Sequence, residues 1–111
     1  MPKRAFDTLS EPMFYVLMAL HTDALCGADI ASWIARKTNN RITIGPGTLY
    51  TILPKLCDED ITREISTDGR KRTYELTDKG RTLYRTECAR LRQCVADIDA
   101  TDSPFVLSKE A

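Results

Sequence analysis

The stretch GPGTLYTILPKLCDEDITREISTDGRKRTYELT, residues 45–77, decides the fold of this chain. Pro46 has a fixed φ that suits the first turn of a helix, and its missing N–H would be unpaired there anyway. The apolar residues that follow fall at i, i+3, i+4 and i+7, the spacing of one buried helical face; they are Leu49, Ile52, Leu53 and Leu56. This spacing predicts a helix that begins at Pro46.

The opposite face of this predicted helix is polar and has few bulky groups near its start. Its members are Thr48, Thr51, Lys55 and Asp58. Together with Gly47, the two threonines would let the helix N-terminus approach a phosphate or a base edge, with free N–H groups and the positive end of the helix dipole pointing at it. An ordinary amphipathic surface helix gives the same pattern, so the helix alone does not establish DNA binding.

A basic hairpin is predicted directly after this helix. Residues 61–66 and 72–77 show partial period-two patterning and are separated by a segment with Asp68-Gly69, a pair typical of hairpin turns. Three cations stand in succession near its tip, where a DNA backbone would pass: Arg70, Lys71 and Arg72. A basic turn alone is usually a solvated loop, but beside the predicted helix it favours a phosphate contact.

Two further helices are predicted before this stretch. Ser10 is a suitable N-cap, and the apolar run behind it ends near His21. Gly27 marks a break, after which residues 28–38 form the second helix. The order helix, helix, helix, hairpin is that of a winged helix-turn-helix, so the predicted fold class is mainly α with a small β-hairpin.

The last predicted element is a long helix that starts with Thr77 as N-cap and runs to about residue 100. Its apolar residues are spaced as in a coiled-coil seam; they are Tyr84, Cys88, Leu91, Val95 and Ile98. No domain core is left to cover such a seam, so we expect it to meet a second copy. Residues 1–77 would then bind DNA and residues 78–111 would form a dimerisation helix and tail. Folding back onto Met13 and Phe14 is the alternative.

The charge of the chain is unevenly distributed although its formal sum is zero. Residues 36–72 hold eight Lys or Arg and five Asp or Glu, a net charge of +3, so positive charge gathers where DNA is predicted. The excess is small, which favours sequence-selective binding over strong non-specific affinity. With 111 residues, of which 42% are hydrophobic, the chain can bury one modest core.

Other functional classes find little support in the sequence. The cysteines have irregular spacing without a C-x-x-C pair, and His21 is the only histidine, so we expect free thiols, no metal site and no cofactor. An enzyme is not expected, because no glycine-rich phosphate loop and no nucleophile paired with a base are found. The absence of a signal-peptide pattern and of a bilayer-length apolar run predicts a cytoplasmic protein.

Several segments, in order and separation, resemble the PadR family of bacterial transcriptional regulators. They are LSEPMFYVL at 9–17, GPGTLY at 45–50 and DGRKRTYELT at 68–77 with Gly80. The resemblance implies a winged-helix domain, a homodimer formed through one C-terminal helix, and a repressor that a small aromatic compound releases from double-stranded DNA in some members. The DNA-facing positions it implies are Thr48, Tyr50, Thr51, Lys55, Arg70, Lys71 and Arg72.

Three residues depart from the family pattern. Pro54 lies inside the recognition helix and removes the N–H that would bond to the carbonyl of Tyr50, so we expect a kink or a loosened turn. Asp60 stands where the family often has Gly, at a position expected to need a positive φ. Ala28 takes the place of a usual aromatic residue after Gly27.

Two further hypotheses remain open from the sequence. Aromatic residues are candidates to line an effector cavity at the dimer interface, because flat apolar ligands suit such walls; they are Phe14, Tyr15 and Trp33, with Tyr84 and Phe105. Core packing is the alternative, and it is favoured for Phe14 and Trp33. A winged-helix adaptor that binds a protein partner and not DNA is the rival function, supported by the zero net charge and by Pro54.

Overall fold

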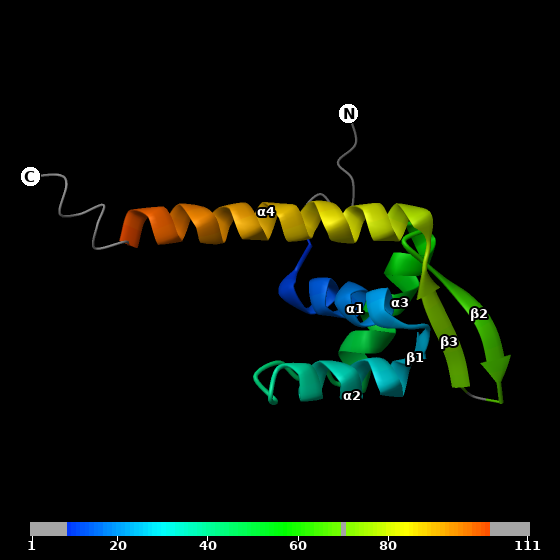
Figure 1. The fold of residues 1–111 in the computed structure, drawn as a ribbon. Helices are drawn as coiled ribbons and strands as arrows, with labels where there is room; N and C mark the ends of the chain where they lie inside the picture. The colour runs from blue at the N-terminus through cyan, green and yellow to red at the C-terminus, as the bar shows by residue number, and fades with distance from the viewer. Residues whose placement is uncertain (1–8, 70, 103–111) are drawn as a thin grey trace, which may run out of the picture.

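The computed structural model describes residues 9–69 and 71–102 of the chain. Within these residues, four helices and three strands follow one another (Figure 1). They are α1 (Glu11–Thr22), β1 (Leu25–Cys26), α2 (Gly27–Lys37), α3 (Pro46–Asp58), β2 (Thr62–Asp68), β3 (Lys71–Leu76) and α4 (Asp78–Asp102). This order confirms the predicted winged helix-turn-helix followed by a C-terminal helix.

The first two helices begin close to where the sequence predicts. The Ser10 hydroxyl accepts a hydrogen bond from the N–H of Met13 at 3.3 Å, which confirms Ser10 as the N-cap of α1. Helix α2 begins one residue earlier than expected, because Gly27 is its first residue and Cys26 occupies the N-cap position. The predicted break therefore lies before Gly27, where the short strand β1 ends.

One hydrophobic core holds α1, α2, α3 and the base of the sheet together. Its fully buried side chains come from all of these elements and include Leu17, Leu20, Ile30, Ile34, Leu56 and Ile61. The predicted inner face of α3 is confirmed, since its four apolar residues are all buried. Packing of these faces against one another, rather than helix propensity alone, fixes the orientation of α3.

The sheet has three strands in the order β1-β3-β2, one more than the predicted hairpin. Strand β1 pairs with β3 in antiparallel fashion, with Leu25 opposite Tyr74. The wing, formed by β2 and β3, extends further toward its tip than expected, since Asp68 is paired with Lys71. A register irregularity between Glu64 and Ser66 interrupts the ladder, and a bulge of this kind bends and twists a strand.

The C-terminal end of α3 is closed by a residue in the left-handed region. Asp60 has a φ of 61°, which confirms the expectation of a positive φ. Its N–H donates to the carbonyl of Cys57 at 3.0 Å, and the N–H of Ile61 donates to the carbonyl of Leu56 at 2.9 Å, the pattern of a Schellman cap. The loosened turn expected at Pro54 does not interrupt the helix, which continues through it to Asp58.

The start of α4 is fastened to the end of α3. The Thr77 hydroxyl accepts a hydrogen bond from the N–H of Gly80 at 3.0 Å, which confirms the predicted N-cap, and it donates to the carbonyl of Asp60 at 2.6 Å. A Cβ placed on Gly80 would lie 2.1 Å from the carbonyl oxygen of Ile61. Only a glycine lets the first turn of α4 approach the base of the wing this closely.

Candidate nucleic-acid interface

A groove separates the N-terminal half of α3 from the wing. This α3–wing groove has a volume of about 450 Å³, and α3 contributes Tyr50, Leu53 and Pro54 to its walls. The wing contributes Thr67, Gly69, Arg72 and Tyr74, and Gly27 contributes from the start of α2. The two elements predicted to contact DNA are thus neighbours in space, and the groove between them has both apolar and basic walls.

The four α3 residues predicted to face DNA are all exposed: Thr48, Tyr50, Thr51 and Lys55. Tyr50 is 75% exposed, which is unusual for a large aromatic side chain and leaves its ring available to a partner. The Thr51 hydroxyl donates to the carbonyl of Gly47 at 3.1 Å. Since its proton is engaged within the helix, this hydroxyl presents its lone pairs outward, as an acceptor.

The wing carries exposed cations at its tip and neutralised charge nearer its base. Lys71 and Arg72 are exposed, whereas Arg70 lies outside the described residues. Arg63 donates to the carboxylate of Glu75 across the strands at 2.7 Å, and this bond raises the pKa of Arg63. Among the ion pairs of residues 9–69 and 71–102, none includes Lys71 or Arg72.

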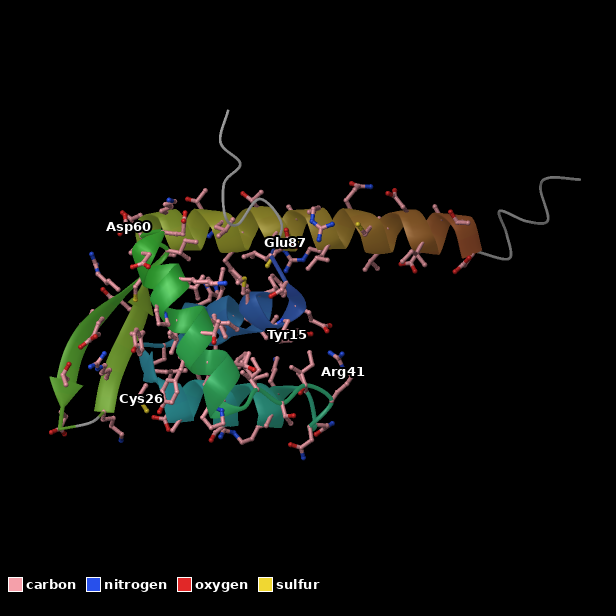
Figure 2. All side chains as sticks on the ribbon, turned by 180° about the vertical axis from the view of Figure 1, so that it is seen from behind. Tyr15, Cys26, Arg41, Asp60 and Glu87 are labelled. Carbon is pink, nitrogen blue, oxygen red and sulfur yellow. The ribbon has the colours of Figure 1, made fainter. Side chains whose placement is uncertain are left out.

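Part of the predicted basic region lies far from the wing. The guanidinium of Arg41 donates to the Tyr15 hydroxyl at 3.0 Å and lies 3.9 Å from the carboxylate of Glu11. Figure 2 shows Arg41 at the opposite end of the domain from the wing. The net charge of +3 counted over residues 36–72 is therefore divided between two places, and the α3–wing groove receives only part of it.

The apolar seam of α4 is divided into a covered and an uncovered part. The Tyr84 ring stacks on Phe14 of α1 with centroids 5.5 Å apart, so this end of the seam folds back within the chain. Burial there raises the pKa of Tyr84 to about 12. Cys88 and Leu91 are half-buried, whereas Val95 and Ile98 are 54% and 56% exposed. Only the far end of the predicted dimerisation seam is without a partner in the described chain.

The predicted effector residues do not form one cavity. Phe14 and Tyr15 line a hollow of about 310 Å³ between α1 and α4, here called the α1–α4 hollow. Trp33 lies on α2 with the Lys37 ammonium 6.0 Å from its ring centroid, and it does not line this hollow. Phe105 falls outside the described residues.

An ion pair that the sequence analysis did not identify lines the α1–α4 hollow. Glu87 is only 8% exposed and accepts two hydrogen bonds from Arg90, at 2.6 and 3.0 Å, which lower the pKa of its carboxyl. Figure 2 shows Glu87 on the side of α4 that faces α1. A Glu and an Arg three residues apart are common on the solvent-exposed face of a helix, so the sequence does not reveal that this pair is partly buried.

Metal sites, disulfides and membrane spans are not found among residues 9–69 and 71–102. In the described part of the chain no group of three or more His, Cys, Asp or Glu side chains is placed to hold a metal ion. All four cysteines are free thiols. None of the helices in residues 9–69 and 71–102 is long and apolar enough to cross a bilayer.

Comparison with known proteins places this architecture in a family. No curated protein matches the sequence. A regulator from Clostridium thermocellum is similar in structure, with a TM-score of 0.71 and 20% identity over 86% of this chain and 100% of that one. A PadR-like transcription factor from Bacteroides fragilis has a TM-score of 0.69 and 19% identity over 81% of this chain and 88% of its own.

A third similar structure is Bacillus subtilis PadR in complex with operator DNA, with a TM-score of 0.64 and 24% identity over 71% of this chain and 48% of that one. At these identities the structures show a shared fold. The sequence itself gives the stronger result, because residues 16–86 match the model of the transcriptional regulator PadR-like family. That match covers most of the winged helix and the first part of α4, and the chain therefore belongs to the PadR-like family of transcriptional regulators.

Proposed function

We propose that the protein is a dimeric, sequence-specific DNA-binding repressor. The observation that carries the proposal is the α3–wing groove, in which an exposed recognition helix stands beside a wing with exposed cations at its tip. The operator complex of Bacillus subtilis PadR, a protein of the same fold, supports this assignment.

The contacts divide into two chemical classes. Thr48, Tyr50 and Thr51 would meet base edges in the major groove, while Lys55 would contact a phosphate together with Arg70, Lys71 and Arg72 of the wing. The Thr51 hydroxyl, whose proton bonds to the carbonyl of Gly47, would accept a hydrogen bond from an exocyclic amine of adenine or cytosine.

The uncovered end of α4 would join two copies of the chain. Val95 and Ile98 are exposed and lie at the spacing of a coiled-coil seam, so pairing with a second α4 would remove them from water. In this proposal residues 78–111 hold two copies of residues 1–77 on two half-sites of one duplex. A dimer binds more tightly and more selectively than either copy alone.

An effector would bind in the α1–α4 hollow. Phe14 and Tyr15 provide aromatic walls there, and the Glu87–Arg90 pair provides polar groups at its edge. A small aromatic molecule between α1 and α4 would alter the angle of α4 and hence the distance between the two recognition helices. Among structures of similar fold, the PcaV regulator of Streptomyces coelicolor has been solved with its natural ligand.

Titration of the purified protein against a labelled duplex from upstream of its own gene tests the proposed function. A scrambled duplex of equal length serves as the control, and both are titrated at several salt concentrations. We expect tighter, salt-dependent binding to the upstream duplex. Equal and weak binding to both would place the operator elsewhere or favour the adaptor, and selection from a random duplex library would separate these two outcomes.

A further inference from the structure

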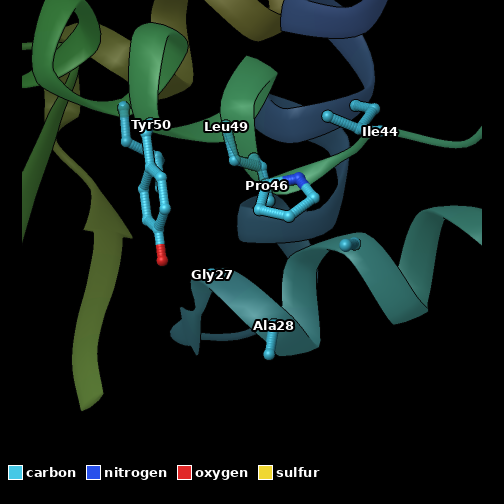
Figure 3. Close-up of a pocket in the computed structure, with 8 residues that line it drawn as sticks. Gly27, Ala28, Ile44, Pro46, Leu49 and Tyr50 are labelled. Carbon is cyan, nitrogen blue, oxygen red and sulfur yellow. The ribbon is translucent and has the colours of Figure 1, made fainter. Parts of the chain in front are cut away.

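A third cavity lies beside Tyr50, between the N-terminal ends of α2 and α3 (Figure 3). This α2–α3 cavity has a volume of about 200 Å³. One wall is formed by α2 and the other by α3, whose Pro46 and Leu49 line it. The Tyr50 ring stands at its edge, with the hydroxyl directed toward the start of α2. Gly27, Tyr50 and Leu53 line both this cavity and the α3–wing groove, so the two adjoin at Tyr50.

The cavity exists because one face of α2 has almost no side chains. Gly27, Ala28 and Ala31 form the α2 wall, and they lie on one helical face because Gly27 and Ala31 are one turn apart. A Cβ on Gly27 would meet only Leu53, at 4.0 Å. The helices are held apart by core residues deeper in the domain, so the small side chains leave an open space instead of a closer contact.

The walls of the cavity define the chemistry of a ligand. No charged side chain is among its lining residues, and the Tyr50 hydroxyl is the only polar side-chain group. The cavity is open to solvent on one side, and burying the apolar surface of a ligand against these walls would remove that surface from water. The volume is sufficient for a single ring and is too small for a drug-sized molecule.

We propose that the α2–α3 cavity binds a small uncharged apolar molecule of about one ring, with at most one polar group placed toward the Tyr50 hydroxyl. Tyr50 lines both this cavity and the α3–wing groove. A ligand in the cavity therefore packs against the Tyr50 ring and restricts the rotamers that the ring can adopt to meet a base edge in the groove. This consequence rests on the proposed function, in which Tyr50 meets DNA; occupancy of the cavity does not.

The binding step is tested without DNA, with 4-fluorophenol as the probe and its ¹⁹F linewidth as the readout. We expect the wild-type protein to broaden the ¹⁹F line of the probe in a saturable manner. Ala31→Leu places a larger side chain in the cavity and should weaken binding about tenfold or more. Ala89→Leu, the same change on the exposed face of α4, is the matched control and should bind as the wild type does.

Thermal unfolding establishes that each variant is folded, and Ala28→Leu replaces Ala31→Leu if the latter does not fold. Absence of saturable broadening with the wild-type protein overturns the proposal. Equal broadening with wild type and Ala31→Leu overturns it too, because the probe would then occupy another place such as the α1–α4 hollow.

The coupling to DNA is tested separately with the duplex that the protein binds. We expect saturating 4-fluorophenol to weaken DNA binding by the wild-type protein about fivefold or more and to have no effect on Ala31→Leu. Unchanged DNA affinity in a protein that binds the probe would overturn the coupling and leave the site in place. A protein that binds the probe but no DNA at all would contradict the proposed function alone.

Discussion

The base and the tip of the wing differ in almost every physical property, although the same two strands form both. At the base, Thr62 is paired with Leu76, and they are 1% and 2% exposed. At the tip, Asp68 is paired with Lys71, and both are exposed. Figure 1 shows the base against the start of α4 and the tip projecting away from the domain. Stability is therefore expected to depend on the base, and binding on the tip.

Two glycines test this difference most strongly. Gly80→Ala should lower the free energy of unfolding by about 3 kcal/mol or more, because the new Cβ would lie 2.1 Å from the backbone oxygen of Ile61, which cannot move without displacing the base of the wing. Gly69→Ala at the tip meets no atom within 4 Å and suffers only from its φ of +64°, so it should cost about 1 kcal/mol. Urea unfolding measures both, and equal losses would contradict the comparison.

Two threonines give the next largest contrast. Thr77→Ala removes the N-cap of α4 and leaves the buried N–H of Gly80 without its partner, so the free energy of unfolding should fall by about 2 kcal/mol. Thr67→Ala at the tip removes only an exposed hydrogen bond to Glu64 and should change it by less than about 0.5 kcal/mol. A loss at position 67 as large as that at position 77 would show that the tip also supports the fold.

The N-cap at the base of the wing and the buried face of α3 could be predicted from the sequence, whereas the third strand of the sheet could not. Thr77 was identifiable as an N-cap because its partner N–H lies three residues ahead, and the apolar face of α3 was identifiable from local spacing. Strand β1 was missed because two residues, Leu25 and Cys26, carry no periodicity and pair with β3, which lies far along the chain. Local patterns predict local hydrogen bonds, whereas pairing at a distance depends on how the core assembles.

In the candidate site, too, local features could be predicted from the sequence and the arrangement of distant residues could not. The exposure of the α3 residues followed from the helical pattern, since a helix with one apolar face must expose the other. The distribution of charge did not follow, because counting residues 36–72 together assigned Arg41 to the DNA face, whereas it bonds to Tyr15 at the far end of the domain. The cavities were equally unpredictable, because each depends on the space left between elements whose relative positions the local sequence pattern does not give.

At the tip, a single cation should affect binding and not folding. Lys71→Ala should weaken binding to every duplex by up to about 1 kcal/mol per protomer and reduce the salt dependence, because one phosphate contact is lost. Thr51→Ala should instead change the preference among sites, because a base contact is lost. Titration of both variants against specific and scrambled duplexes separates the two effects. An equal loss of selectivity in both would contradict the proposed division between base and phosphate contacts.

The smallest expected change in the free energy of unfolding is a gain in stability, and it comes from a substitution at the base of the wing. Asp60 has a φ of 61° at the end of α3, a conformation that glycine adopts without steric cost. Asp60→Gly should therefore raise the free energy of unfolding by about 0.5 kcal/mol, after the larger entropy that glycine has in the unfolded chain is subtracted. The hydrogen bond from Thr77 goes to the backbone carbonyl of residue 60 and would be kept.

Asp58→Gly is the matched control for this substitution, because Asp58 is the last helical residue of α3 and does not have a positive φ. There the same change should lower the free energy of unfolding by about 0.5 kcal/mol, since glycine is the poorer helix former. Denaturant midpoints that move in opposite directions would show that backbone conformation at position 60, and not the loss of one acidic side chain, causes the gain. Midpoints that move together would attribute both effects to charge. Neither variant should alter DNA binding, because Figure 2 shows Asp60 at the end of α3 that lies away from the tip of the wing.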